Sequence, residues 1–399
     1  MKLLITANSP GEVAWIRPLA EQVAARGWSC DIILYPCTFA TGKEAEVLRG
    51  YPGVERVWPK QTLFSLFWKE GRRYPPGTPL IHLGGDLMYT AILQRRFGWK
   101  CWSYLWARPW WDRAFAGYFS RNFQSTAGLR RRRVDPSKIM EVGDLVVDLV
   151  NFQVPELPPR DPDLITFLPG SRDEEIRHAL PLFARVAEIL RESRPRLRFQ
   201  TLLSPFLSLQ RLRELLERAV DPRMDHAGGK LVEDLYLCRD GLQIPVIQER
   251  SLEHEARSSL ALSLPGTKTA EAASLGVPCL TIVPLNCPEV LPVHGLLGLL
   301  DWLPGGSHLK GKLLLRQKDR VGLLAQPNQL LGRAVMPEMV DFLSAREIAA
   351  RVADLLDRPE ELHQKSLLLR QAFQELAGAS GKMLDAIRSS CEPRWHCGV

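Results

Sequence analysis

The sequence has no long apolar run. None of its segments reaches the roughly 18 consecutive apolar residues that a membrane-spanning helix needs, so none is expected to cross a bilayer. The opening residues, MKLLITANSPGE, carry one lysine and a very short apolar stretch before polar turn residues. A signal peptide has a longer apolar core, so we expect these residues to form a first β-strand.

The cysteines lack the spacing of a redox or zinc site. None of the eight forms a C-x-x-C pair, and several lie in apolar, strand-like runs where a thiol serves as a small hydrophobic side chain. This usage favours a reducing, cytoplasmic environment. The tail CEPRWHC offers only Cys391, His396 and Cys397 as ligands at a chain end, so we expect no metal site.

The sequence also lacks the motifs of a nucleic-acid-binding module. Its formal net charge is +7, and most of the basic side chains are arginines, which suit phosphate and carboxylate groups. The densest basic run, at 130–133, is typical of an exposed helix end, and no recognition motif accompanies it. We therefore expect no nucleic-acid partner.

The order of elements predicts an α/β protein with parallel, doubly wound sheets. The chain begins with a strand at 3–7, a helix at 12–26 and a strand at 31–35, and the alternation continues along most of its length. At 399 residues the chain exceeds one typical core, so we expect two domains. The second domain should contain a long helix at 360–379.

The segment 151–163, which is rich in proline and acidic residues, is the expected linker. We place an N-terminal, acceptor-binding domain at 1–155 and a C-terminal, nucleotide-binding domain at 156–380. A tail follows at 381–399, and the last helix can pack back on the first domain. Two Rossmann-like domains of this kind are expected to face each other across a ligand-binding cleft.

Two turns in the C-terminal half share one pattern. LPGS at 168–171 and LPGT at 264–267 each end an apolar run and lead into a helix, and glycine allows the backbone to approach a ligand. The second turn continues into TKTAEAASLGVP, in which Glu271 lies near the start of the helix. An acid there either stabilises the helix or accepts hydrogen bonds from ribose hydroxyls.

Arg172 favours a phosphate site at the first of these turns. Ser171 and Glu174 have the spacing of a capping box, so a purely structural role is open for Ser171. Arg172, however, is placed in the first helical turn, where a cation opposes the helix dipole. A bound anion would remove that penalty, because both the helix N-terminus and the guanidinium attract negative charge.

Taken together, these motifs resemble one enzyme family. LPGSR followed by E-I, then PGTKTAEAASLGVP, then PNQLLGRAVMPE at 327–338, is similar to the pattern of lipid-A-disaccharide synthases, which are two-domain GT-B glycosyltransferases. NSPGE, LGGDLMY and EVGDLVVDLV resemble its less specific N-terminal motifs. Pro265 and Asp144 depart from the usual residues of the family, so the chain resembles a divergent member.

The resemblance implies inverting transfer of a hexosamine-type sugar from a UDP donor, used as a co-substrate, to a hydroxyl of a lipid-linked acceptor. Neither a metal nor another cofactor is expected, because helix N-termini and arginine can stabilise the leaving diphosphate. The residues matched to nucleotide-sugar binding are Gly170, Ser171, Arg172, Gly266, Thr267, Glu271, Asn328 and Glu338.

The same resemblance gives two candidates for the general base that deprotonates the acceptor. Asp86 is the first and Glu12 the second. Each also has a structural alternative, since Asp86 can cap the helix that follows Gly84-Gly85, and Glu12 can stabilise the start of the first helix.

Three apolar segments bear on the acceptor and on partners. The segment 57–76 mixes aromatic and basic residues and favours contact with a membrane surface or acyl chain. The segment 102–111 is expected in the core, with one edge near the acceptor. For 290–316, membrane contact and a homodimer interface both remain open. We expect a cytoplasmic protein that can lie on the inner face of the cell membrane.

Two other functions are consistent with these patterns. UDP-N-acetylglucosamine 2-epimerases share the GT-B architecture and similar phosphate-binding turns, but act on the free nucleotide sugar. A non-catalytic nucleotide-sugar-binding protein is the third alternative, because the N-terminal motif is altered.

Overall fold

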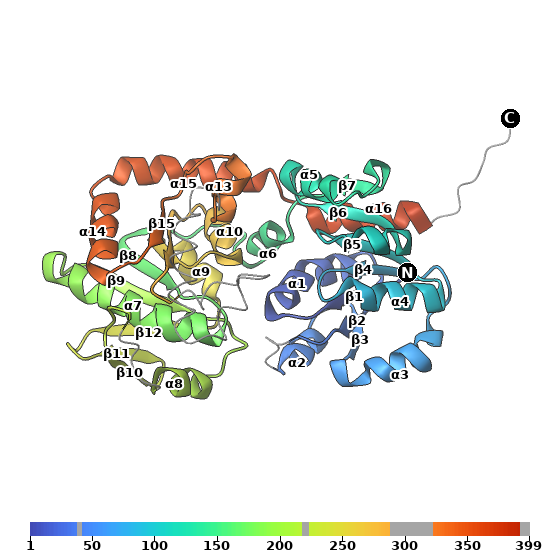
Figure 1. Cartoon of the computed structure of the whole chain (residues 1–399), viewed down its shortest axis with the longest axis horizontal. Helices are drawn as coiled ribbons and strands as arrows, with labels where there is room; N and C mark the ends of the chain where they lie inside the picture. Colours follow the sequence, from blue (N-terminus) through green and yellow to red (C-terminus); the bar gives the residue numbers. More distant parts are fainter. Residues whose placement is uncertain (38–41, 218–222, 288–321, 392–399) are drawn as a thin grey trace. The chain divides into compact units, whose positions relative to one another are not determined.

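The computed structural model describes residues 1–37, 42–217, 223–287 and 322–391 (Figure 1). The chain forms two compact units: unit 1 contains Met1–Phe152 and Glu375–Val399, and unit 2 contains Gln153–Gln374. Each unit is built on its own largely parallel sheet flanked by helices, so the predicted α/β class with two Rossmann-like sheets is confirmed. The segment 290–316, together with His396 and Cys397, lies outside the described residues.

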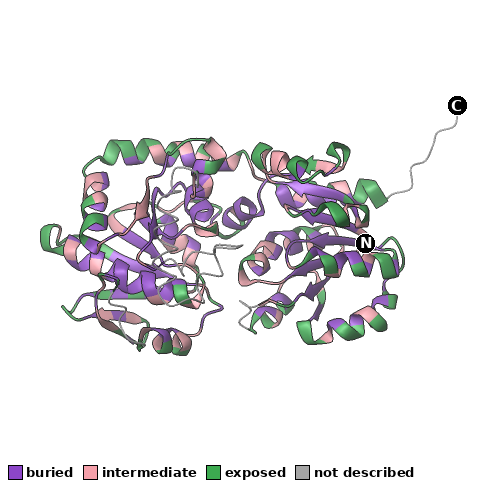
Figure 2. Cartoon of the chain, viewed as in Figure 1, coloured by how far each residue is buried: buried purple, intermediate pink, exposed green. Residues whose placement is uncertain are grey.

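Unit 1 has a seven-stranded sheet in the order β3-β2-β1-β4-β5-β6-β7, and all of its pairings are parallel. Its strands are β1 (Lys2–Ala7), β2 (Ser29–Leu34), β3 (Val54–Trp58), β4 (Pro79–His82), β5 (Lys100–Tyr104), β6 (Phe115–Ser120) and β7 (Ile139–Glu141). The central strands are buried along nearly their whole length (Figure 2), as is typical of a parallel sheet covered on both faces.

The helices of unit 1 are α1 (Pro10–Ala25), α2 (Glu44–Arg49), α3 (Leu63–Trp68), α4 (Leu87–Phe97), α5 (Phe123–Arg131), α6 (Leu145–Gln153) and α16 (Ala379–Cys391). Short 3₁₀ helices occupy Lys60–Thr62, Glu70–Arg73, Pro109–Ala114 and Pro136–Lys138. No helix among the described residues is both long enough and apolar enough to cross a membrane.

The chain returns to unit 1 through α16. The carboxylate of Asp148 in α6 accepts hydrogen bonds from the backbone N–H groups of Gly378 and Ser380, both at 2.7 Å, and from the Ser380 hydroxyl at 2.5 Å. Gly378 has a φ of 86°, a conformation that favours glycine. The helix predicted at 360–379 is found as Pro359–Gln374 and ends earlier than expected, because the chain turns at this glycine and starts a separate helix.

Unit 2 has an eight-stranded sheet in the order β10-β11-β12-β9-β8-β13-β14-β15. Its strands are β8 (Asp161–Leu168), β9 (Arg198–Leu202), β10 (Gly229–Val232), β11 (Leu235–Cys238), β12 (Gln243–Ile247), β13 (Ser258–Ser263), β14 (Cys279–Pro284) and β15 (Glu338–Asp341). The pairings β10–β11 and β11–β12 are antiparallel and the others are parallel.

The helices of unit 2 are α7 (Asp173–Ser193), α8 (Leu209–Glu217), α9 (Ser251–Ala256), α10 (Thr267–Ser274), α13 (Gln326–Leu331), α14 (Ala345–Leu356) and α15 (Pro359–Gln374). The boundaries of the units differ from the expected ones. The first segment of unit 1 ends at Phe152, and unit 2 ends at Gln374. Residues 381–391 form part of α16 rather than a tail.

Candidate functional site

The two glycine-containing turns of unit 2 lie side by side. β8 and β13 are neighbouring parallel strands, and their last residues, Leu168 and Ser263, are partners in the register. The backbone N–H of Leu264 also donates to the carbonyl of Leu168 at 3.4 Å. The turns at 168–172 and 264–267 therefore leave the same edge of one sheet, the carboxyl edge, where α/β folds bind their ligands.

The first turn is closed by Glu175. Its Oε2 accepts hydrogen bonds from the backbone N–H groups of Ser171 at 2.9 Å and Arg172 at 3.1 Å. Gly170 has a φ of 97°, and a Cβ there would lie 2.4 Å from Oε2 of Glu175. The predicted capping pair of Ser171 and Glu174 is therefore wrong, because the helix begins one residue later than a Ser171 cap requires.

Arg172 also differs from its predicted position. It is the N-cap residue of α7, with an extended backbone, and does not lie in the first helical turn. Its Nη1 donates to Oε1 of Glu175 at 2.6 Å, so its charge is balanced by a carboxylate of the same turn. An anion bound here would compete with Glu175 for the N–H donors of Arg172.

The second turn is more open. Gly266 precedes α10 with φ 156° and ψ −166°, a conformation that is almost confined to glycine, and a Cβ there would have nothing within 4 Å. Thr267 and Lys268 follow in the first turn of α10, whose backbone N–H groups have no partner within the helix. Thr269 fastens the turn, because its hydroxyl donates to the carbonyl of Gly266 at 2.8 Å. This is the geometry of a helix N-terminus that can receive phosphate oxygens.

Lys268 was not singled out by the sequence patterns, yet it contacts Glu271, the residue predicted to bind the ribose. Its Nζ lies 2.5 Å from Oε2 of Glu271. Burial alone would lower the pKa of Lys268, but the nearby carboxylates of Glu271 and Glu255 raise it. Glu271 is thus paired with a lysine in the structure, and a ribose hydroxyl would have to share that carboxylate.

Glu255 of α9 lies beneath this pair. Its side chain is fully buried, and neither carboxylate oxygen has a hydrogen-bond partner among the residues that the structure describes. Burial raises the pKa of Glu255 to about 8, and Lys268 opposes that rise. No feature of the sequence distinguishes Glu255 from Glu253, a partly exposed acid in the same short helix.

Asn328 and Glu338 are bonded mainly to the protein's own backbone. Oδ1 of the fully buried Asn328 accepts from the N–H groups of Val335 and Met336 at 2.9 and 2.8 Å, and its Nδ2 donates to Oε1 of Glu338 at 2.6 Å. Glu338 also accepts from the N–H groups of Leu324 and Ala325. These two side chains therefore hold the start of α13.

The segment before α13 in turn contacts α10. The backbone N–H of Gln326 donates to Oγ1 of Thr269 at 3.1 Å. Through this bond, Glu338 and Asn328 support the second turn without reaching into it. Their geometry favours a positioning role.

In unit 1, Glu12 occupies the same kind of position as Glu175. It is the third residue of α1, and its Oε2 accepts from the N–H groups of Asn8 and Ser9, both at 2.9 Å. A Cβ on Gly84 would lie 2.1 Å from the Glu12 carboxylate carbon, so only glycine fits beside it. Burial raises the pKa of Glu12, whereas its bonds to the backbone lower it. Glu12 thus stabilises the start of the first helix, which is the structural alternative that the sequence offers for it.

Asp86 is exposed at the start of α4. Its Oδ1 accepts from the backbone N–H of Met88 at 2.8 Å. Asp86 therefore caps the helix, which is the structural role that the sequence predicts as an alternative to the general base. A cap of this kind uses one oxygen, and the exposed carboxylate can also accept a proton from a ligand. Of the two candidates for the base, Asp86 is the more accessible.

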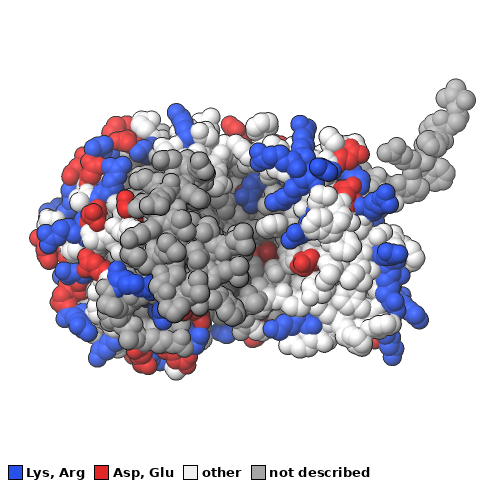
Figure 3. Space-filling view, viewed as in Figure 1, with Lys and Arg blue, Asp and Glu red and all other residues white. Residues whose placement is uncertain are grey.

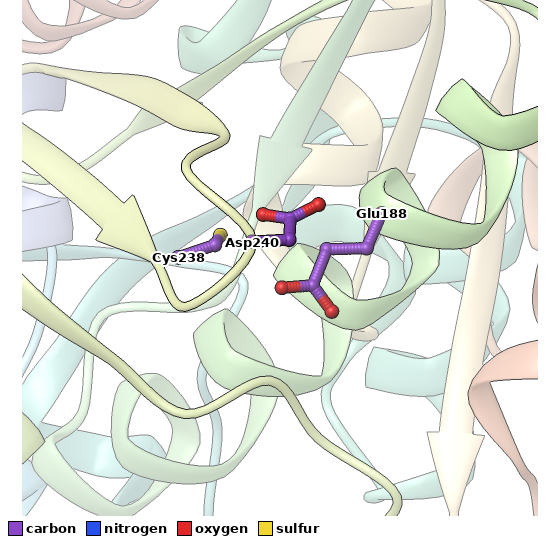
Figure 4. A group of neighbouring side chains, drawn as sticks. All are labelled: Glu188, Cys238 and Asp240. Atoms are coloured by element: carbon purple, nitrogen blue, oxygen red, sulfur yellow. The ribbon is translucent and has the colours of Figure 1, made fainter.

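One group of potential metal ligands occurs among the described residues. Atoms of Glu188, Cys238 and Asp240 lie within 4.8 Å of one another (Figure 4). Glu188 already pairs with Arg185 at 2.8 Å, and burial raises the pKa of the Cys238 thiol to about 12. The group comes from elements other than the two turns and enters no step considered below.

The sequence is similar to lipid-A-disaccharide synthases. It is 32% identical over 139 residues to that of Solibacter usitatus, across 35% of this chain and 31% of the relative. It is 27% identical over 234 residues to that of Methylobacillus flagellatus, across 55% of this chain and 50% of the relative. The matches thus span about a third to a half of these relatives. No protein-family model matches the chain.

The fold is similar to that of a solved UDP-GlcNAc 2-epimerase from Neisseria meningitidis bound to UDP-GlcNAc. The TM-score is 0.60 at 12% identity, and the match covers 98% of this chain and 100% of the other. An identity this low establishes the fold alone. The sequence matches, however, all point to one family, and the chain is a divergent relative of the lipid-A-disaccharide synthases with a GT-B fold.

Proposed function

We propose that the chain is an inverting glycosyltransferase that moves a hexosamine-type sugar from a UDP donor to a hydroxyl of a lipid-linked acceptor. The observation that carries this proposal is the adjacency of the turns 168–172 and 264–267 at the carboxyl edge of one sheet. The similarity of the sequence to lipid-A-disaccharide synthases supports the choice of reaction.

In this proposal unit 2 binds the donor. The diphosphate is received by the first-turn N–H groups of Thr267 and Lys268 and by the guanidinium of Arg172. As the bond to the sugar breaks, negative charge collects on the leaving UDP, and these positive groups stabilise it without requiring a metal ion. Glu271 accepts a hydrogen bond from the ribose while remaining close to Lys268.

Unit 1 supplies the base. Asp86 is the proposed residue, because its carboxylate is exposed and only one of its oxygens is needed for the helix cap. It removes the proton of the acceptor hydroxyl, which attacks the anomeric carbon as UDP leaves from the opposite face, and this gives inversion. Glu12 is partly buried and bonded to the backbone, so we propose that it shapes the first turn of unit 1.

Exposed aromatic residues in unit 1 support a lipid-linked acceptor and contact with a membrane surface. Phe64 and Trp68 in α3 are 73% and 57% exposed, and Trp110 is 66% exposed. The guanidinium of Arg96 lies 4.9 Å from the centre of a Trp68 ring. In Figure 3 much of the visible face of unit 1 is uncharged, and lysine and arginine side chains gather along its edges. Aromatic residues bordered by cations are typical of a membrane-interface surface.

The similarity of the fold to a UDP-GlcNAc 2-epimerase favours a second candidate, an epimerase that acts on the free nucleotide sugar. A product assay separates the two. The protein is incubated with UDP-GlcNAc or with acylated UDP-hexosamines, each with and without a bacterial lipid extract. UDP release that depends on the extract supports the transferase, whereas isomerisation of the donor without extract supports the epimerase.

The variants Asp86→Asn and Arg172→Ala are assayed beside the wild type. The transferase proposal expects Asp86→Asn to bind UDP normally but to lose turnover, since only the base is removed. It expects Arg172→Ala to weaken the stabilisation of the protein by UDP. Normal turnover by Asp86→Asn would exclude that residue as the base.

A further inference from the structure

Unit 2 contains a cavity that the proposed transfer reaction does not use. Its volume is about 550 Å³, and it lies among α7, the end of α8 and the hairpin of β10 and β11. None of its lining residues belongs to the turns at 168–172 or 264–267. A volume of this size lies in the range of sites for small-molecule ligands.

The charges that line this cavity are mostly positive. Arg177, Lys230 and Arg239 contribute three permanent cations, and His178 and His226 add two imidazoles. Glu217 is the one acidic lining residue among those that the structure describes. Such a lining attracts an anion, and its two arginines offer planar donor groups that match phosphate oxygens.

Two nitrogen atoms of these side chains are left without a partner in the described part of the chain. They are Nε of Arg177 and Nδ1 of His226, and both atoms are buried. The other end of the Arg177 guanidinium is held by Glu174, at 3.2 Å, which fixes its position. Buried nitrogen atoms without a hydrogen-bond partner are uncommon, so the protein's own groups do not fully satisfy the polar side chains around this cavity.

Two consecutive glycines make room for the lining side chains. A Cβ on Gly228 would lie 2.3 Å from Nε of Arg239, and a Cβ on Gly229 would lie 2.6 Å from the ring of Tyr236. The guanidinium of Arg239 therefore lies directly against the backbone of Gly228. The side chain of any residue larger than glycine would overlap it. This arrangement is independent of the charge count and shows that Gly228 leaves room for Arg239 beside the cavity.

The remaining lining is apolar. Pro181, Leu215, Leu216 and Tyr236 offer hydrocarbon and aromatic surface beside the cations. We propose that this cavity is a binding site for a small, soluble phosphorylated molecule that carries a ring, such as a nucleotide or a sugar phosphate. Arg177 and Arg239 bind its phosphate, and the apolar residues contact its ring. The proposal does not rest on the transfer reaction.

Arginine footprinting tests the proposal residue by residue. The full-length protein is treated with phenylglyoxal in the presence and absence of inorganic pyrophosphate, and the modified peptides are quantified by mass spectrometry. We expect pyrophosphate to slow modification of Arg177 and Arg239 several-fold. The exposed Arg196 and Arg346, which line neither site, serve as internal controls and should react at an unchanged rate.

Two variants and a lipid arm complete the test. Gly228→Ala should displace Arg239 and abolish its protection. Arg177→Gln leaves the glycines intact and should raise more than tenfold the pyrophosphate concentration that is needed to protect Arg239. Unchanged reactivity of Arg239 with pyrophosphate overturns the proposal. Equal slowing at Arg346, or protection by anionic phospholipid vesicles but not by pyrophosphate, overturns it as well.

Discussion

Glu175 binds Arg172, the residue expected to bind phosphate. The Arg172 guanidinium donates to one oxygen of Glu175 at 2.6 Å, and the other oxygen accepts from two backbone N–H groups of the same turn. The carboxylate thus already uses part of the guanidinium's N–H donors, and a bound diphosphate would compete with it for Arg172. The proposed site in unit 2 is therefore in competition with its own helix cap.

Replacing Glu175 by Gln should tighten UDP binding. The variant keeps an oxygen for the backbone N–H groups but releases Arg172 from its charged partner, so we expect the Kd for UDP to fall several-fold. Loss of the charged cap should lower the free energy of unfolding by about 1 kcal/mol. Isothermal titration with UDP and urea unfolding measure the two effects.

The matched control is Glu174→Gln, which removes an equal charge from the same helical turn. Glu174 pairs with Arg177 rather than Arg172, at 3.2 Å. Its replacement should leave the Kd for UDP unchanged. If the two variants bind UDP equally tightly, overall charge and not the release of Arg172 governs binding.

Replacing Gly84 by Ala should destabilise unit 1. The new methyl group would overlap the Glu12 carboxylate and push it away from the N–H groups of Asn8 and Ser9. Two partly buried backbone donors then lose their acceptor, and the free energy of unfolding should fall by about 2 kcal/mol. Urea unfolding followed by circular dichroism measures the change.

Gly128→Ala provides the control for this change. Gly128 lies within α5, and a Cβ there would have nothing within 4 Å. Alanine at this helical position should raise the free energy of unfolding by about 0.5–1 kcal/mol. A Gly84→Ala protein as stable as the wild type would show that Glu12 moves away at no cost.

The sequence predicts the repeating strands of both units because apolar runs bounded by turn residues are a local signal. The strands expected at 3–7 and 31–35 are found as β1 (Lys2–Ala7) and β2 (Ser29–Leu34), which are buried along almost their whole length. The antiparallel hairpin of β10 and β11 was missed, since each strand has only 4 residues and β10 lies at the sheet edge. Edge strands of this kind carry little local signal.

At the candidate site, the sequence predicts which turns lie together but not which side chains bind each other. The adjacency of the two turns follows from sheet order, which the pattern of a parallel α/β chain makes plausible from sequence. The occupation of the first turn by Glu175 does not, because Glu174 and Glu175 are chemically identical neighbours and a shift of one residue in the helix start decides which of them caps. The pairing of Lys268 with Glu271 likewise depends on side-chain conformation.

Glu255 should make stability depend on pH. Folding raises its pKa from the ordinary 4.5 to about 8, so between these values the folded protein keeps a proton that the unfolded chain has released. Stability from this group is present at low pH and is lost as pH rises through 8. Relative to Glu255→Gln, the wild type should lose more than about 1 kcal/mol between pH 5 and pH 8.

Urea unfolding of both proteins at several pH values measures this difference, and contributions from all other groups cancel in it. Glu253→Gln is the control, because hydrogen bonding to Arg250 lowers the pKa of Glu253. Its titration lies below the tested range, so its difference from the wild type should stay constant. Parallel stability curves for wild type and Glu255→Gln would mean that Glu255 is ionised in the folded protein.

The exposed face of α3 should determine binding to lipid surfaces. Phe64 and Trp68 lie close together, with ring centroids 5.8 Å apart, and each exposes more than half of its side chain. Insertion of two aromatic rings into the interface contributes roughly 1.5 kcal/mol or more for each ring. The double variant Phe64→Ser, Trp68→Ser should therefore bind vesicles of phosphatidylglycerol and phosphatidylethanolamine at least about tenfold more weakly in a sedimentation assay.

Leu367→Ser, which removes an apolar residue of unit 2 that is 51% exposed, should bind as the wild type does. Equal loss in both proteins would mean that general surface hydrophobicity, and not α3, directs the protein to lipid.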